Sequence, residues 1–182
     1  MAQILLGGMC FVFAILNFDS NVINFNFIIL FIFTLTIGTR LSLMMPRSNF
    51  AVSFSDAPIF LSFLVFGGET AIILASLEII VSCLYLKSKG GKFSYPTILL
   101  NFGVTALSTG LTFIAWQNLS SYLNLPQNPS NISQIITTLG IIAICQFVFT
   151  SVFAALHYSL KAKESLWQAW KRECFTSSMS QI

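Results

Sequence analysis

The polar residues that could carry chemistry lie inside or at the edge of long apolar segments. Glu69 and Glu78 are the only charged residues between positions 57 and 86, and Asp56 directly precedes this segment. Asn101 lies in the next apolar segment. A carboxylate inside hydrocarbon is costly unless a partner offsets its charge, so such residues mark a candidate functional site by default. We therefore predict that a ligand-binding cavity, or a bend in the chain, is lined by Asp56, Glu69, Glu78 and Asn101.

Each of the two glutamates also has a purely structural interpretation. Glu69 would begin a helix, where the helix dipole favours a negative charge, so a capping role explains it equally well. Glu78 is two and a half helical turns further on and faces roughly the other way. A hydrogen bond from Asn101 or from a hydroxyl group of the next helix would make Glu78 structural too. The sequence leaves both interpretations open.

Asn101 belongs to a stripe of small and polar residues that repeats at helical spacing. Small residues let two helices approach closely, and hydroxyl groups can form hydrogen bonds between helices in a membrane. Helix packing therefore explains the stripe more simply than ligand binding does. Its members are Asn101, Gly103, Thr105, Ala106, Ser108, Thr109 and Gly110.

The composition assigns the whole chain to the membrane proteins. Of the 182 residues, 55% are hydrophobic and only 8% are charged, with a mean hydropathy of +0.82. An ordinary soluble domain has about 25% charged residues, so this chain lacks the charges for a surface facing water. The predicted fold class is all-α: a polytopic membrane helix bundle with a broken or re-entrant helical hairpin.

Catalysis is not expected from these residues. The chain shows no nucleophile paired with a base, no cluster of metal ligands and no phosphate-binding loop. Its four cysteines, Cys10, Cys83, Cys145 and Cys174, are far apart and form no CxxC pair, so we interpret them as small apolar side chains. We predict no catalytic residue, no metal site and no cofactor, and the net charge of +3 gives no reason to expect nucleic acid as a partner.

The apolar segments predict where the helices lie. The hairpin consists of two arms, 57–66 and 69–86, on either side of the Gly67-Gly68 pair, and Pro58 suits the first turn of the first arm. Four further segments are predicted to cross the membrane completely. They cover about 3–18, 22–44, 95–116 and 134–160, and together with the hairpin they form a membrane domain of residues 1–160.

The positions of Lys and Arg support the hairpin. Basic residues occur at 40–47, at 87–92 and in the tail after 160, whereas the turn at Asp19 and the 117–133 loop have none. Cytoplasmic loops collect Lys and Arg. The three basic segments can share the cytoplasmic side only if residues 57–86 enter and leave the membrane on that same side. This places the N-terminus and the C-terminal tail in the cytoplasm.

The tail, residues 161–182, is predicted to be a basic amphipathic segment at the membrane surface. Leu166, Trp167 and Trp170 fall on one side of a helix, and indole rings anchor at headgroup level. Lys163 and Lys171 would attract anionic lipid. A coupling element that passes membrane motion to a following segment is the alternative interpretation.

Several short motifs are spaced along most of the chain. They are 53–56 (SFSD), 60–62 (FLS), 66–69 (FGGE), 77–78 (LE), 101–102 (NF), 106–108 (ALS) and 165–170 (SLWQAW). Together they resemble the N-terminal membrane-integral sensor module of bacterial diguanylate cyclases, HD-type phosphodiesterases and histidine kinases, and the resemblance covers roughly residues 38–172.

In that family a catalytic output domain usually follows, but these 182 residues contain no GGDEF, HD or kinase motif. The resemblance therefore implies a non-catalytic sensory or ligand-binding module of bacterial signal transduction in the inner membrane. It would be either a truncated form or a module that works through a partner. Its expected partners are the lipid bilayer and a cytoplasmic or membrane signalling protein, with a homodimer as a further option.

Two alternatives remain. The stretch 55–58 (SDAP) and the Phe66-Gly67 turn are similar to substrate-binding subunits of energy-coupling-factor vitamin transporters. Such subunits need paired small residues in the first helix to dock a motor, and Gly7-Gly8 is the nearest equivalent. The third interpretation is a structural membrane protein whose polar groups only pack helices.

Overall fold

The computed structural model describes residues 2–38, 43–44, 51–52, 56–91, 94–122 and 131–171. These residues form an all-α bundle, as the sequence predicts. Two two-residue strands, β1 (Leu43–Met44) and β2 (Ala51–Val52), add a single antiparallel pair. The helices are α1 (Ala2–Leu16), η1 (Ser20–Val22), α2 (Phe25–Phe33), η2 (Thr34–Gly38), α3 (Asp56–Phe66), α4 (Gly68–Ser88), α5 (Tyr95–Tyr122) and α6 (Ile132–Ala162).

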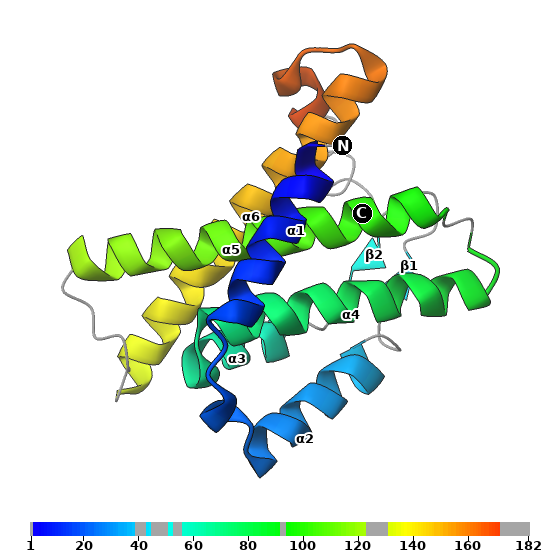
Figure 1. Ribbon diagram of the computed structural model, residues 1–182. Helices are drawn as coiled ribbons and strands as arrows, with labels where there is room; N and C mark the ends of the chain where they lie inside the picture. Colours follow the sequence, from blue (N-terminus) through cyan, green and yellow to red (C-terminus); the bar gives the residue numbers. More distant parts are fainter. Residues whose placement is uncertain are drawn as a thin grey trace.

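The centre of the bundle is the antiparallel pair α4 and α5 (Figure 1). α1 crosses this pair and packs mainly on α5, while α6 crosses α5 obliquely and extends beyond it (Figure 1). A core of buried apolar side chains joins α3, α4, α5 and α6. It consists of Ile59, Phe63, Ala71, Leu74, Ala75, Trp116 and Ile142.

Among the described residues, three helices are long and apolar enough to span a membrane: α4, α5 and α6. This indicates a membrane protein. Within the described residues the predicted spans 3–18 and 22–44 contain shorter apolar helices: α1 has 15 residues, and α2 has nine before η2 continues it by five. About 20 residues cross the hydrocarbon core. α4, by contrast, is one arm of the hairpin and is long enough to cross alone.

The second predicted helix, 22–44, is wrong at both ends. Asn24 caps α2, since its side-chain Oδ1 accepts a hydrogen bond from the backbone N–H of Phe27 at 2.9 Å. The α-helix gives way to a π-helical turn at Thr34, whose hydroxyl donates to the carbonyl of Leu30 at 2.7 Å. Such bonding to the preceding turn often bends a helix, and β1 then replaces the predicted helix end.

The chain reverses between α3 and α4 at a single residue, Gly67. Its φ of 94° and ψ of 168° belong to a backbone region that only glycine adopts readily. α3 has 11 residues and α4 has 21. At a rise of 1.5 Å per residue α3 is about half as long as α4, so it lies beside the first half of α4 only. The first residue of α3 therefore lies level with the middle of α4.

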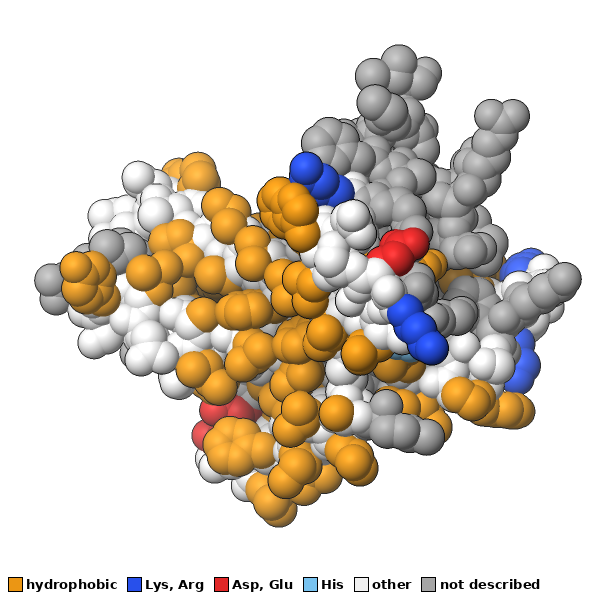
Figure 2. Space-filling model, turned by 90° about the horizontal axis from the view of Figure 1, so that it is seen from above, with side chains coloured by type: hydrophobic (Ala, Val, Ile, Leu, Met, Phe, Trp, Pro, Cys, Tyr) orange, Lys and Arg blue, Asp and Glu red, His pale blue; other side chains and the backbone are white. Residues whose placement is uncertain are grey.

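Lysine side chains lie in two parts of the described structure. Figure 2 shows them at the right edge of this face, where α4 ends and α5 begins, and again over its middle, with apolar side chains over much of the remaining face. Lys87 lies 3.7 Å from the ring centroid of Tyr95 and Lys89 lies 5.7 Å from that of Tyr85. Arg40, Arg47 and Lys92, which the topology argument also used, lie outside the described residues.

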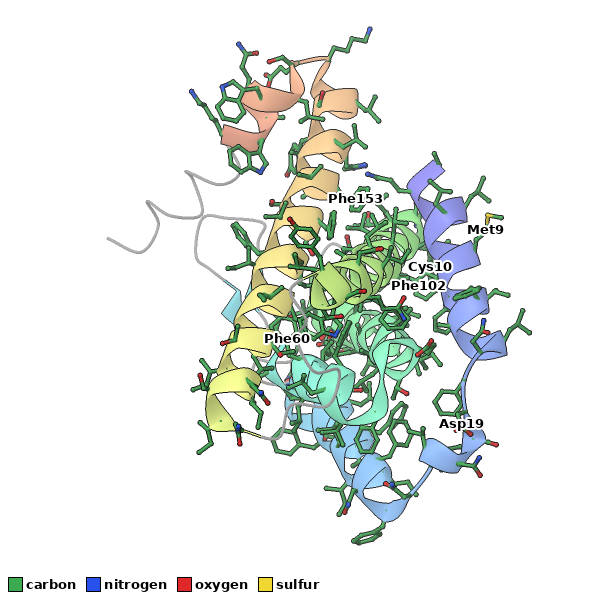
Figure 3. All side chains as sticks on the ribbon, turned by 90° about the vertical axis from the view of Figure 1, so that its left-hand side faces the viewer. Met9, Cys10, Asp19, Phe60, Phe102 and Phe153 are labelled. Carbon is green, nitrogen blue, oxygen red and sulfur yellow. The ribbon has the colours of Figure 1, made fainter. Side chains whose placement is uncertain are left out.

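Glycines bring α1 and α5 into backbone contact. A Cβ atom added to Gly103 would lie 2.8 Å from the carbonyl oxygen of Gln3, and one added to Gly7 would overlap Gly103 itself. Gly110 leaves room for the side chain of Cys10, which Figure 3 shows turned toward α5 while Met9 points away. The glycines of the predicted stripe thus serve helix packing.

The described part of the tail folds back on α6 instead of extending away from it. α6 ends at Ala162, and the next residue, Lys163, adopts a left-handed conformation with a φ of 54°. Residues 166–171 form a short helix, and the indole Nε1 of Trp170 donates to the Ser151 hydroxyl at 3.2 Å. Trp167 stacks on Trp170 with centroids 5.3 Å apart and remains 59% exposed.

Candidate functional site

The two arms of the hairpin bring two carboxylates together. Glu78 is 4% exposed in the middle of α4, and its Oε1 accepts a hydrogen bond from the hydroxyl of Ser82 at 2.8 Å. Asp56 begins α3, outside the three candidate spans. Although Asp56 as a residue is exposed, surrounding protein atoms desolvate its carboxylate and Glu78 repels its charge, which together raise the pKa of Asp56 to about 6.

Asn101 of α5 contacts α4 at Cys83. Its amide Nδ2 donates to the Sγ atom of Cys83 at 3.5 Å, across the interface between α4 and α5. Cys83 is 2% exposed and follows Glu78 by little more than one turn. Three of the four predicted site residues, Asp56, Glu78 and Asn101, thus gather around the middle and distal half of α4.

The fourth predicted residue, Glu69, is separate. It lies in the first turn of α4, and at 1.5 Å rise per residue the nine residues to Glu78 put about 13 Å between them along the helix. Its carboxylate folds back toward the turn, where its Oε2 atom would be 3.5 Å from a Cβ added to Gly67. Glu69 thus lies at the bend, whereas Asp56, Glu78 and Asn101 lie further along α4.

A polar cluster between α5 and α6 was not predicted in full. The side chain of Gln146 in α6 lies 2.9 Å from the Thr112 hydroxyl, 3.2 Å from that of Thr109 and 3.4 Å from that of Ser108. All three hydroxyl residues are at least 98% buried. Ser108 and Thr109 belong to the predicted stripe, whereas Gln146 was missed. The available signal was an amide side chain within the apolar run 141–149.

One hydroxyl of the hairpin lacks a partner. Ser62 of α3 is completely buried, and within the part of the chain that the structure describes no group forms a hydrogen bond with its Oγ atom. Serine in a helix usually donates to the carbonyl four residues earlier, as Ser76 of α4 does toward Ile72 at 2.6 Å. An unsatisfied buried hydroxyl costs about 1–3 kcal/mol. The hairpin thus contains a polar group that its present packing does not satisfy.

The hairpin and its neighbours consequently contain a buried carboxylate, a second carboxylate with a raised pKa, an amide and an unsatisfied hydroxyl. The two carboxylates, which lie near each other, can accept hydrogen bonds from a ligand. The structure also places Gly7 inside the contact with α5, so Gly7 is not available to dock a second protein. No family model, curated protein or solved structure matches this chain.

Proposed function

We propose that this chain is a membrane-embedded sensory or ligand-binding module of bacterial signal transduction. The observation that carries the proposal is the carboxylate of Glu78, which is 4% exposed in a candidate membrane span and has a second carboxylate, Asp56, beside it on the other arm of the hairpin. Intramembrane carboxylates mark ion pathways, proton relays and ligand contacts. The resemblance to bacterial sensor modules supports the same interpretation.

The hairpin has the properties of an element that changes its packing. α3 is short, reverses at a glycine and has the unsatisfied hydroxyl of Ser62 on its buried side. These features lower the free-energy difference between the present packing of α3 and another one. A ligand, or a change in protonation, shifts such an equilibrium if it favours one of the two arrangements.

A route for the signal leads from the hairpin to the tail. α3 and α4 pack on α5 and α6, and Gln146 joins α5 to α6 through the three buried hydroxyl groups. α6 then carries the tail, which is fixed to it by the bond from Trp170 to Ser151. A repacked hairpin would therefore tilt α6 and displace the exposed Trp167.

We place the chain in the bacterial inner membrane with both its N-terminus and its tail in the cytoplasm. The end of the bundle with Lys87 and Lys89 is then cytoplasmic, and Asp19 lies toward the opposite side. Single cysteines at Asp19 and Lys89, in a background without native cysteines, test this with a membrane-impermeant thiol reagent. We expect labelling of intact cells at position 19 only. Labelling at position 89 alone would show that the orientation is the opposite of the proposed one.

The sensory proposal is tested by substitutions that permanently alter the polar groups of the hairpin region. Glu78→Gln preserves the shape of the side chain, and we expect it to change the distance between spin labels at Ser88 and Gln168, two exposed positions. Asn101→Ala should act in the same direction. Glu164→Gln, an exposed carboxylate in the tail, is the matched control and should leave the distance unchanged.

Two outcomes would contradict the proposal. If both variants of the hairpin region insert normally and the distance stays constant, the hairpin is not coupled to the tail. If both variants prevent stable expression while Glu164→Gln does not, Glu78 and Asn101 only pack helices. Purification of the wild-type chain with a tightly bound vitamin would instead favour the transporter alternative.

A further inference from the structure

A small cavity opens beside the hairpin turn, at the opposite end of α4 from the lysines. Its volume is about 160 Å³, and its walls come from the hairpin and from the second half of α5. An engineered apolar cavity of about 150 Å³ holds a molecule of benzene. The space therefore suits a ligand of about six non-hydrogen atoms. The walls include Phe63, Gly67, Gly68, Phe113, Trp116 and Gln117.

Three aromatic residues, Phe63, Phe113 and Trp116, contribute to these walls. Phe63 and Phe113 contact each other edge to face, with ring centroids 5.8 Å apart and an angle of 78° between the rings. Trp116 is almost completely buried, with 6% of its surface exposed. The faces of such rings attract cations, Trp most strongly, and the attraction grows where water is excluded.

Glu69 follows the two glycines of the wall but is not itself one of the residues that line the cavity. The carboxylate of Glu69 lies over Gly67, whose backbone forms part of the wall. The sequence contains no Lys or Arg between residues 48 and 86 or between residues 93 and 160, so both wall segments are without a basic side chain. The carboxylate of Glu69 would repel an anionic ligand and attract a cationic one.

We propose that this cavity binds a small methylated ammonium ion. Its methyl groups would contact Phe113 and Trp116, and its charge would face the carboxylate of Glu69. The shared chemistry is a quaternary ammonium group, supplied either by a free solute such as choline or by the headgroup of phosphatidylcholine. The inference rests on the proposed ligand-binding function, and its test measures binding alone.

The test measures binding of radiolabelled choline to the purified full chain in nanodiscs of phosphatidylglycerol. We expect saturable binding with a dissociation constant below about 10 mM. Unlabelled tetramethylammonium should compete, whereas 3,3-dimethylbutan-1-ol, the uncharged analogue of choline with the same shape, should compete at least about tenfold more weakly. These competition measurements need no variant and so do not depend on the folding of one.

Variants locate the site. Glu69→Gln should weaken choline binding about tenfold, and Trp116→Phe should weaken it by a smaller factor because Phe attracts cations less strongly. Asp19→Asn removes another acidic side chain and should leave binding unchanged. Size-exclusion profiles identical to wild type establish that the variants are folded.

The outcomes separate the alternatives. Nanodiscs that contain phosphatidylcholine should bind less choline if the lipid headgroup uses the site, and the same amount if only the free solute does. Absence of saturable binding, equal competition by the uncharged analogue, or wild-type affinity in a folded Glu69→Gln variant would overturn the proposal. If choline binds but the distance between spin labels at Ser88 and Gln168 does not change, the binding site is supported and the sensory function is rejected.

Discussion

The Thr112 hydroxyl of α5 lies 2.9 Å from the side-chain oxygen of Gln146 in α6, and it also reaches the carbonyl of Ser108 at 2.8 Å. Its single proton is thus shared between its own helix and the neighbouring one. The Nε2 atom of Gln146 donates to Thr109 at 3.2 Å. Since only 11% of the α6 span is buried, these bonds are a large part of what fixes the rotation of α6 on α5.

Gln146→Leu should therefore weaken the attachment of α6. Hydrogen bonds between membrane helices contribute about 0.6 kcal/mol each on average, so we expect the free energy of unfolding to fall by about 1–2 kcal/mol. Unfolding of the purified protein in mixed micelles by a denaturing detergent measures this. Thr137→Ala removes an exposed hydroxyl that bonds within α6 and should change stability by less than about 0.5 kcal/mol. Equal effects of the two substitutions would contradict the cluster's role.

Gly103→Ala tests the contact between α1 and α5. The new Cβ atom would lie 2.8 Å from backbone atoms of Gln3 and Ile4, and backbone cannot move aside as a side chain can. We expect a loss of about 1–3 kcal/mol, the usual effect of overpacking. Gly8→Ala is the matched control, because nothing lies within 4 Å of its new Cβ atom. It should stabilise α1 by about 0.5–1 kcal/mol, and a loss there would mean that α1 is placed differently.

Asp56 should make stability depend on pH. Desolvation, and secondly Glu78, raise its pKa from 3.8 to about 6 in the folded protein. The folded state therefore holds this proton more tightly than the unfolded state does, and the associated stability is lost as the pH rises through about 6. Thermal unfolding midpoints measured between about pH 4 and pH 6.5 should fall with pH. Asp56→Asn should reduce this fall, whereas Asp19→Asn should retain it; an unchanged slope in Asp56→Asn would show that another group is responsible.

Ser62→Ala should be neutral or stabilising, by up to about 1 kcal/mol, because it removes a buried hydroxyl that lacks a partner. Ser76→Ala provides the comparison. That hydroxyl is equally buried but donates to the carbonyl of Ile72 at 2.6 Å, so its loss should cost about 0.5–1.5 kcal/mol. Both values come from the same unfolding titration. A clear loss of stability in Ser62→Ala would indicate that the hydroxyl is satisfied in the membrane.

The sequence by itself determined the class of the protein and the position of the hairpin. Apolar segments of sufficient length can only be helices in a bilayer, since each backbone group must be satisfied within its own segment. Gly67 followed by Gly68 identified the reversal because this backbone conformation excludes other residues. Local chemistry was therefore sufficient to predict where α3, α4, α5 and α6 lie. It did not predict the bend at Thr34 or the end of α2.

Only the tertiary structure decided which polar residues meet. The two arms have different lengths, so α3 places Asp56 beside Glu78 and leaves Glu69 at the turn; the sequence could not show this because it does not specify how the arms pair. The partner of Ser108, Thr109 and Thr112 was equally hidden, since Gln146 follows Thr112 by 34 residues and only the crossing of α5 and α6 brings them together. Hydrophobic periodicity identifies the buried side of a helix, but the neighbour on that side is selected by packing over the whole bundle.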